Sequence, residues 1–238
     1  MSILNEYRKN LTALKAKTAF ILTDHNFEKF SEEQVEEAIN DAAMDFSLRC
    51  QCVKDEINIL VEEDRVVYDV KAFITAANNA TPGTNKKFGF LIRVGLSGVD
   101  EPSLMPSHSM AVNFSNSDMY QTIYANRFFV DLLSPGKLQI MPPSADGEAL
   151  PSEDGNIQVF YVGLPDFMDT GADYPDAIIP PQFHDSIATG AAAMLLYEGD
   201  EQDLLAAQDL DMEFKRQIMR AVAQEYEGQG IYQSARPV

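Results

Sequence analysis

Cysteine and histidine are scarce in this chain of 238 residues, and tryptophan is absent. Cys50 and Cys52 fall on a predicted helix, where residues two positions apart point about 200° away from each other. A disulfide between them is therefore not expected, and both are interpreted as buried apolar residues. His25, His108 and His184 are far apart in the sequence and match no ligand pattern. We therefore expect no zinc site.

Positive charge is also low. Lysine and arginine number 18 against 37 aspartates and glutamates, which gives a formal net charge of -19. Surfaces that grip nucleic acid are basic, so this balance argues against one, although an acidic surface can face DNA and repel it. No apolar run reaches the roughly 18 residues of a membrane helix, and the amino terminus lacks a signal-peptide pattern. With 45% apolar residues, the length suits one large or two small domains made and kept in a cytoplasm.

The first predicted helix covers residues 2–20. Its apolar residues recur every three or four positions and give one stripe, formed by Leu4, Tyr7, Leu11 and Leu14. The outer face is locally basic, with Arg8, Lys9, Lys15 and Lys17. Two interpretations stay open: this face pairs with acidic helices of the same fold, or it contacts a partner protein.

The second predicted helix has a well-specified start. Ser31 can cap it and Gln34 can reach back to complete a capping box, while Phe30 and Val35 occupy the two positions of a hydrophobic staple. An apolar stripe continues from there to Val53, with acidic residues on the other side. The pattern predicts a long amphipathic helix.

From residue 57 to residue 162 the apolar residues follow a period of two, and turn residues multiply. The predicted strands are residues 58–61, 66–73, 88–94, 109–114, 127–132, 138–141 and 157–161. Proline and glycine separate the strands, as at Pro82 and Gly83 or at Pro135 and Gly136. This segment predicts a β domain inserted between helices.

Two more helices are predicted after the strands. One begins at Pro181, where a missing N–H is harmless, and ends at Gly199. The other covers residues 200–226, and carboxylates fill its first half, among them Asp203, Asp209, Asp211 and Glu213. From Gly228 the sequence has no period and little apolar content, so residues 228–238 are expected to be a flexible tail.

The helices need one another to be stable. Each has one apolar stripe, and none is stable alone in water at its length. Burying the stripes together predicts an α+β fold, in which amino-terminal and carboxy-terminal helices form a four-helix bundle with an inserted antiparallel β domain. The expected divisions are a bundle of residues 1–55 and 177–227, an insert of residues 56–176, and the tail.

Three motifs occur in order along the chain. The second helix, FSEEQVEEAINDAAMDF, contains the apolar-Asn-Asp-Ala run at residues 39–42. The segment RFFVDLLSPGKLQIMPPSADG ends a strand in Met-Pro-Pro at residues 141–143. The last quarter passes from a strand through an acidic loop to a helix opened by Phe-His-Asp at residues 183–185, then to Gly199 and a second helix. Together these motifs resemble the head-tail adaptor (connector) proteins of tailed bacteriophages.

The resemblance implies an assembly role and not catalysis. Such an adaptor binds beneath the portal protein of a filled head as a homo-oligomeric ring, usually a dodecamer, closed by heterologous contacts. It extends the DNA channel and gives tail or nozzle proteins a platform, and DNA passes through without specific binding. The implied location is the virion neck, after assembly in the host cytoplasm, and no cofactor or metal is implied.

Two sets of residues are candidate sites in such a ring. Tyr232 and Arg236 in the tail would bind the portal or a neighbouring subunit, because tyrosine and arginine dominate interface hot spots. The acidic residues of the last helix either line the channel and repel DNA or pair with cations of neighbouring subunits. These channel-lining candidates are Asp203, Asp209, Asp211 and Glu213.

Three other functions stay open. An enzyme would need a convergent constellation, but the sequence has no phosphate loop, nucleophile elbow or metal-ligand spacing. His184 and Asp185 are interpreted as structural residues of a helix start. A β-type binding module could use an acidic loop for calcium, although the spacing misses the alternate ligands of a calcium loop: Asp166, Asp169, Asp173 and Asp176. A different virion protein, such as a tail completion or minor capsid protein, would differ in its place in assembly.

Overall fold

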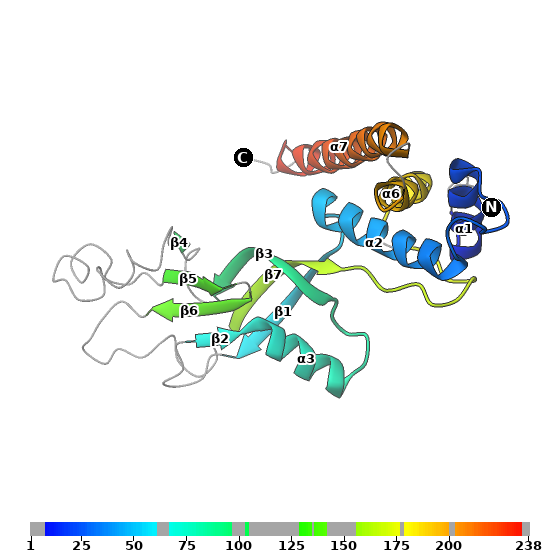
Figure 1. Ribbon diagram of the computed structural model, residues 1–238. Helices are drawn as coiled ribbons and strands as arrows, with labels where there is room; N and C mark the ends of the chain where they lie inside the picture. The colour runs from blue at the N-terminus through cyan, green and yellow to red at the C-terminus, as the bar shows by residue number, and fades with distance from the viewer. Residues whose placement is uncertain are drawn as a thin grey trace, which may run out of the picture. The chain divides into compact units, whose positions relative to one another are not determined.

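A computed structural model describes residues 8–60, 67–96, 103–104, 129–134, 136–141, 156–176, 179–199 and 203–234 (Figure 1). Within these residues the chain is a mixed α+β protein with five α-helices and two small sheets. It divides into two compact units, which we call the helical unit (Met1–Val53 and Leu164–Val238) and the β unit (Lys54–Gly163). The boundaries fall at residues 54 and 164, and not at the expected residues 56 and 177.

The loop after the last strand belongs to the helical unit because polar contacts bind it there. The Asn40 side-chain amide donates to the Met168 carbonyl at 3.2 Å, and its carbonyl oxygen accepts the Met168 N–H at 2.9 Å. The Leu11 N–H donates to the Asp173 carbonyl at 2.7 Å. These contacts join residues more than a hundred positions apart, so the sequence pattern did not reveal them.

The helical unit contains α1 (Leu11–Leu22), α2 (Glu32–Cys50), the short 3-10 helix η2 (Pro181–Phe183), α6 (His184–Tyr197) and α7 (Leu204–Ser234). Helix α6 contacts α1, α2 and α7, and it lies next to all three in Figure 1. Its side chains are buried on nearly every side. A helix buried in this way needs small and apolar residues all round, which the segment SIATGAAAMLL supplies.

Close packing at the centre of the helical unit depends on one glycine. A Cβ added at Gly190 of α6 would lie 2.8 Å from the Phe214 ring of α7. Phe214 in turn lies 6.2 Å from Phe46, ring centre to ring centre, and Phe46 lies 5.5 Å from Phe183. Gly190 therefore permits a close approach of α6 and α7, and three phenylalanines from α2, η2 and α7 fill the core beside it.

Local caps decide where the helices begin. The Gln34 N–H donates to the Ser31 hydroxyl at 3.2 Å, and the Ser31 N–H donates to the Gln34 side chain at 2.9 Å, so the predicted capping box of α2 is confirmed. Residues 2–7 of the first predicted helix lie outside the described residues, and α1 begins at Leu11, where the Asn10 side chain accepts the Ala13 N–H at 2.9 Å and caps the helix.

The β unit contains two sheets and one helix. One sheet has the order β1-β7-β3, from β1 (Lys54–Leu60), β7 (Asn156–Leu164) and β3 (Lys87–Leu96). The other has the order β2-β6-β5-β4, from β2 (Val67–Asp69), β6 (Lys137–Met141), β5 (Phe129–Ser134) and β4 (Ser103–Leu104). The pairs β1–β7, β2–β6 and β5–β6 are antiparallel, whereas the short β4 pairs with β5 in parallel.

The helix α3 (Val70–Ala80) corrects the prediction of one strand over residues 66–73. Only Val67–Asp69 is strand, because the Asp69 side chain accepts the Ala72 N–H at 3.2 Å and starts a helix. The strand predicted at residues 109–114 lies outside the described residues. Tight turns need glycine where φ is positive, as at Gly136 between β5 and β6, where φ is +84°.

Helix α7 extends further than predicted. Its backbone is helical through Ser234, so it passes the expected end at residue 226 and includes the first part of the segment expected to be a flexible tail. Two glycines in that stretch each cost about 1 kcal/mol relative to alanine, but the glutamines and other helix formers beside them favour continuation.

Candidate protein interface on the last helix

Helix α7 has two opposite faces. One is buried in the core of the helical unit and consists of Ala207, Phe214, Ile218 and Ala221. The other carries large apolar side chains in solvent: Leu205 is 76% exposed, Met212 58% and Met219 72%. These three are seven residues apart, so they fall on nearly one line along the helix. We call them the α7 stripe.

The α7 stripe differs from the scattered apolar residues that any surface has. Its members span 14 residues, which corresponds to about 21 Å of helix, on the side turned away from the core. Methionine is flexible and polarisable, and is frequent where a surface adapts to a protein partner. An aligned stripe of this kind is typical of a protein contact.

Charged residues follow one side of the α7 stripe. Asp209, Glu213, Arg216 and Arg220 are spaced by four, three and four positions, so they lie on one side of the helix. We call them the charged flank. The Arg216 guanidinium donates to Glu213 at 2.5 Å, in a pair whose side chains are 63% and 40% exposed. Exposed pairs of this kind are weak, so these charges can engage another molecule.

The four acidic candidates on α7 do not form one ridge. At 100° per residue, the sequence positions of Asp203, Asp209, Asp211 and Glu213 are spread around the helix. Asp203 pairs with Lys29, which precedes α2. Asp211 pairs with Lys215 at 2.6 Å. The carboxylates therefore have partners within the chain at three of the four positions, and their lining of a DNA channel stays a prediction.

The two residues expected to bind the portal stand at the end of the chain. Tyr232 belongs to the last turns of α7, so its backbone is helical and not extended. Arg236 lies outside the described residues. Their binding to a partner stays a prediction.

His184 connects three segments of the helical unit. Its Nδ1 accepts the Lys9 N–H at 3.1 Å, and its Nε2 lies 3.3 Å from the Ile179 carbonyl. These contacts require a neutral ring with its proton on Nε2. Burial lowers the pKa of His184, and hydrogen bonds to backbone groups oppose this only in part. The structural interpretation of this residue is thus supported by its contacts, since both ring nitrogens bind backbone.

One carboxylate of the acidic loop, that of Asp173, has a structural role. Asp173 accepts N–H groups of Thr170 and Asp169, at 2.8 and 2.9 Å, and the Thr170 hydroxyl at 2.8 Å. These hydrogen bonds, first those from Thr170, lower the pKa of Asp173. Among the described residues, no group of three or more His, Cys, Asp or Glu side chains could hold a metal ion.

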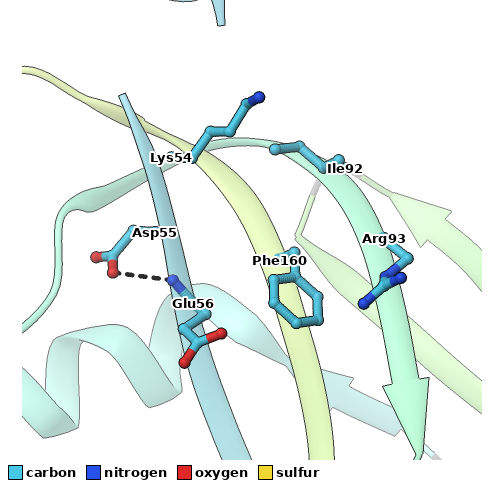
Figure 2. Close-up of a pocket in the computed structure, with 6 residues that line it drawn as sticks. All are labelled: Lys54, Asp55, Glu56, Ile92, Arg93 and Phe160. Atoms are coloured by element: carbon cyan, nitrogen blue, oxygen red, sulfur yellow. Dashed lines mark hydrogen bonds between the residues drawn. The ribbon is translucent and has the colours of Figure 1, made fainter. Parts of the chain in front are cut away.

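The β unit has an open hollow of about 480 Å³. Figure 2 shows Phe160 of β7 between Glu56 of β1 and Arg93 of β3. The Arg93 guanidinium lies 4.7 Å from the centre of the Phe160 ring, a distance suited to a cation–π contact. Lys54, Asp55 and Ile92 complete the lining. The hollow combines an aromatic floor with charges of both signs, which suits a peptide segment better than a buried small molecule.

Neither surface was predicted from the sequence, for different reasons. The seven-residue spacing of Leu205, Met212 and Met219 is visible in the sequence. It was overlooked because the apolar residues on the core face of the same helix form a stronger pattern. The hollow had no such signal, because it depends on the pairing order β1-β7-β3.

Comparison with known proteins assigns no relative. No protein-family model and no curated protein sequence matches the chain.

No described helix combines the length and the apolar character that crossing a membrane requires.

Proposed function

We propose that the protein is a ring-forming head-tail adaptor of a tailed bacteriophage, which binds beneath the portal and forms part of the neck. The observation that carries the proposal is the α7 stripe. A net charge of -19 disfavours non-specific association between copies of the chain. An aligned row of exposed apolar side chains on such a chain is best explained by a protein contact made during assembly.

The division into two units supports the same function. The helical unit, which we interpret as the four-helix bundle of an adaptor, is built from both ends of the chain. The β unit is inserted between them and has its own apolar core, so it can project as an independent module. In this proposal the helical units close a ring of twelve by heterologous contacts, and the β units and their hollows receive tail proteins.

The proposal assigns no chemistry to the chain. DNA passes through the ring without specific binding, and the negative charge of the protein keeps the duplex from adhering to the wall, since DNA binding is driven by cations that replace counterions. Tyr232 and Arg236 remain the proposed anchors to the portal or to a neighbouring subunit.

The test is assembly on a purified portal ring, observed by electron microscopy. We expect the wild-type chain to add a second ring to the portal and Met212→Glu with Met219→Glu to fail. The matched control is Ala206→Glu, a new carboxylate at an exposed position on the same helix, away from the α7 stripe. A wild-type chain that never binds portal, or a double variant that forms normal rings, would show the proposal to be wrong.

A second candidate rests on the hollow of the β unit. Its open shape and its Arg93–Phe160 contact favour a β-type binding module, or a different virion protein such as a tail completion or minor capsid protein. Arg93→Ala with Phe160→Ala separates the candidates. An adaptor with these changes should still form rings on the portal but bind tail proteins less well.

A further inference from the structure

The charged flank of α7 is complementary to itself. Its acidic residues, Asp209 and Glu213, come first, and its basic residues, Arg216 and Arg220, come last. When two copies of the helix run antiparallel, the first residue of one copy is level with the last residue of the other. Asp209 then lies level with Arg220 of the second copy, and Glu213 level with Arg216 of the second copy. Four opposite-charge pairs can form across the contact.

The same alignment brings apolar residues close together. In that alignment Met212 lies level with residue 217 of the second copy, two residues or about 3 Å from the level of that copy's Met219, which is within reach of a flexible methionine side chain. The register that sets the two methionines level thus differs from the register of the charged pairs by two residues, and both are centred on the same turn of α7. One antiparallel alignment therefore buries the α7 stripe and pairs the charged flank.

We propose that the free protein is a homodimer in which the α7 stripes of two copies pack antiparallel. This inference goes beyond the proposed function, because it concerns the chain before any ring forms. A contact related by a two-fold axis is isologous and closes at two copies, so it cannot itself build a ring. The dimer contact covers the α7 stripe until binding to the portal displaces the second copy.

The antiparallel direction follows from charge. In a parallel pair the charged flank of each copy would face the other side of the partner's α7 stripe, so the two charged flanks would not meet and these pairs would not form. The helix dipoles also favour the antiparallel pair, because each positive end then lies beside a negative end. The Glu213–Arg216 pair within one helix is exposed and weak, so its members can be shared with the second copy.

The contact is small. Three apolar side chains per copy, each more than half exposed in the single chain, form a narrower surface than a stable dimer usually has. We therefore expect a weak dimer, seen at high micromolar concentration and lost on dilution. Such weakness suits a dimer that must open when a ring assembles.

Charge reversal tests the alignment. One variant, Asp209→Arg with Glu213→Arg, makes the charged flank wholly basic, and another, Arg216→Glu with Arg220→Glu, makes it wholly acidic. Sedimentation equilibrium of the full chain at low salt should show dimers for the wild type and monomers for each variant alone. An equimolar mixture of the two variants should restore dimers. The matched control, Glu33→Arg with Glu37→Arg on the exposed acidic side of α2, changes the net charge as much as the first variant and should still dimerise.

Each outcome decides the proposal. It is wrong if the wild type is monomeric at every concentration, if either variant alone dimerises as well as the wild type, or if the mixture stays monomeric. Circular dichroism confirms that the variants are folded, and restored dimers in the mixture require folded partners. Binding to the portal is measured separately, so a monomeric wild type that forms rings overturns the dimer and leaves the proposed function standing.

Discussion

The helical unit and the β unit satisfy their backbones in different ways. In the helical unit, long capped helices pair their own backbone groups, so side chains such as Phe46 and Phe214 serve mainly to pack. In the β unit, polar side chains connect segments that are distant in the sequence. The Tyr161 hydroxyl lies 3.0 Å from the Asp55 carboxylate and 2.8 Å from the Lys86 carbonyl. One unit should therefore be most sensitive to lost volume and the other to lost hydrogen bonds.

The largest expected effect is loss of an aromatic ring from the helical core. Phe46→Ala should lower the free energy of unfolding of the helical unit by about 3 to 5 kcal/mol, because Phe46 is fully buried and touches two other rings. Hydrogen exchange measured by mass spectrometry should show faster exchange in α2, α6 and α7. Equal acceleration in β1 and β7 would contradict the independence of the two cores.

A smaller loss of stability is expected when the Tyr161 hydroxyl is removed from the β unit. Tyr161→Phe keeps the ring in the core but removes the single hydroxyl proton that the Asp55 carboxylate and the Lys86 carbonyl share, at a cost of about 1 to 3 kcal/mol. Burial, and then the neighbouring Asp55, raises the pKa of the Tyr161 hydroxyl, so it remains a donor at neutral pH. Exchange should accelerate in β1 and β7. An unchanged β unit would show that packing and not hydrogen bonding dominates there too.

Acidification should weaken the helical unit through His184. Because burial lowers the pKa of His184 in the folded chain, the unfolded chain takes up a proton first as the pH falls. The stability is fully present above the ordinary pKa of about 6.5 and decreases below it. One proton limits the slope to about 1.4 kcal/mol per pH unit. Urea unfolding followed by circular dichroism between pH 7.5 and pH 5 measures it.

Two histidine variants isolate this slope. His184→Gln should flatten the decrease, whereas His25→Gln, which changes an exposed histidine of the same unit, should leave it intact. The Arg8 charge and the Asp185 carboxylate also act on His184, in opposite directions, so Asp185→Asn should make the decrease begin at the same pH but continue further. If the free energy of unfolding still decreases on acidification in His184→Gln, groups other than His184 cause the decrease.

The smallest effect is expected from a surface ion pair on α7. Asp211→Asn removes the contact with Lys215 and should change the free energy of unfolding by only about 0.3 to 0.5 kcal/mol, because an exposed pair four residues apart is weak and screened by salt. The difference from wild type should vanish at 1 M salt in chemical unfolding. A larger loss would mean that this carboxylate has a further role in the helical unit.

Particular residues show where prediction from the sequence succeeded. The start of α2 was predicted because Ser31 and Gln34 lie three positions apart and form their capping box with adjacent backbone. The α+β composition was predicted because the apolar period changes along the chain. The start of α3 was missed even though its signal, Asp69, is also local. Residues 66–73 had apolar positions compatible with both periods, so the cap alone could have decided between them.

The sequence by itself determined the cap of α2, the change from helices to strands and back to helices, and the acidic charge, because these depend on neighbours within a few positions or on composition. Only the tertiary structure decided that Asn40 binds the loop at Met168, that α6 is buried on nearly every side, and that Tyr161 meets Asp55 across 106 positions. Contacts between distant segments depend on which strands pair and which helix faces meet, and many pairings fit one apolar pattern. The side of α7 left uncovered was decided in the same way, by the packing of α6 against the opposite side.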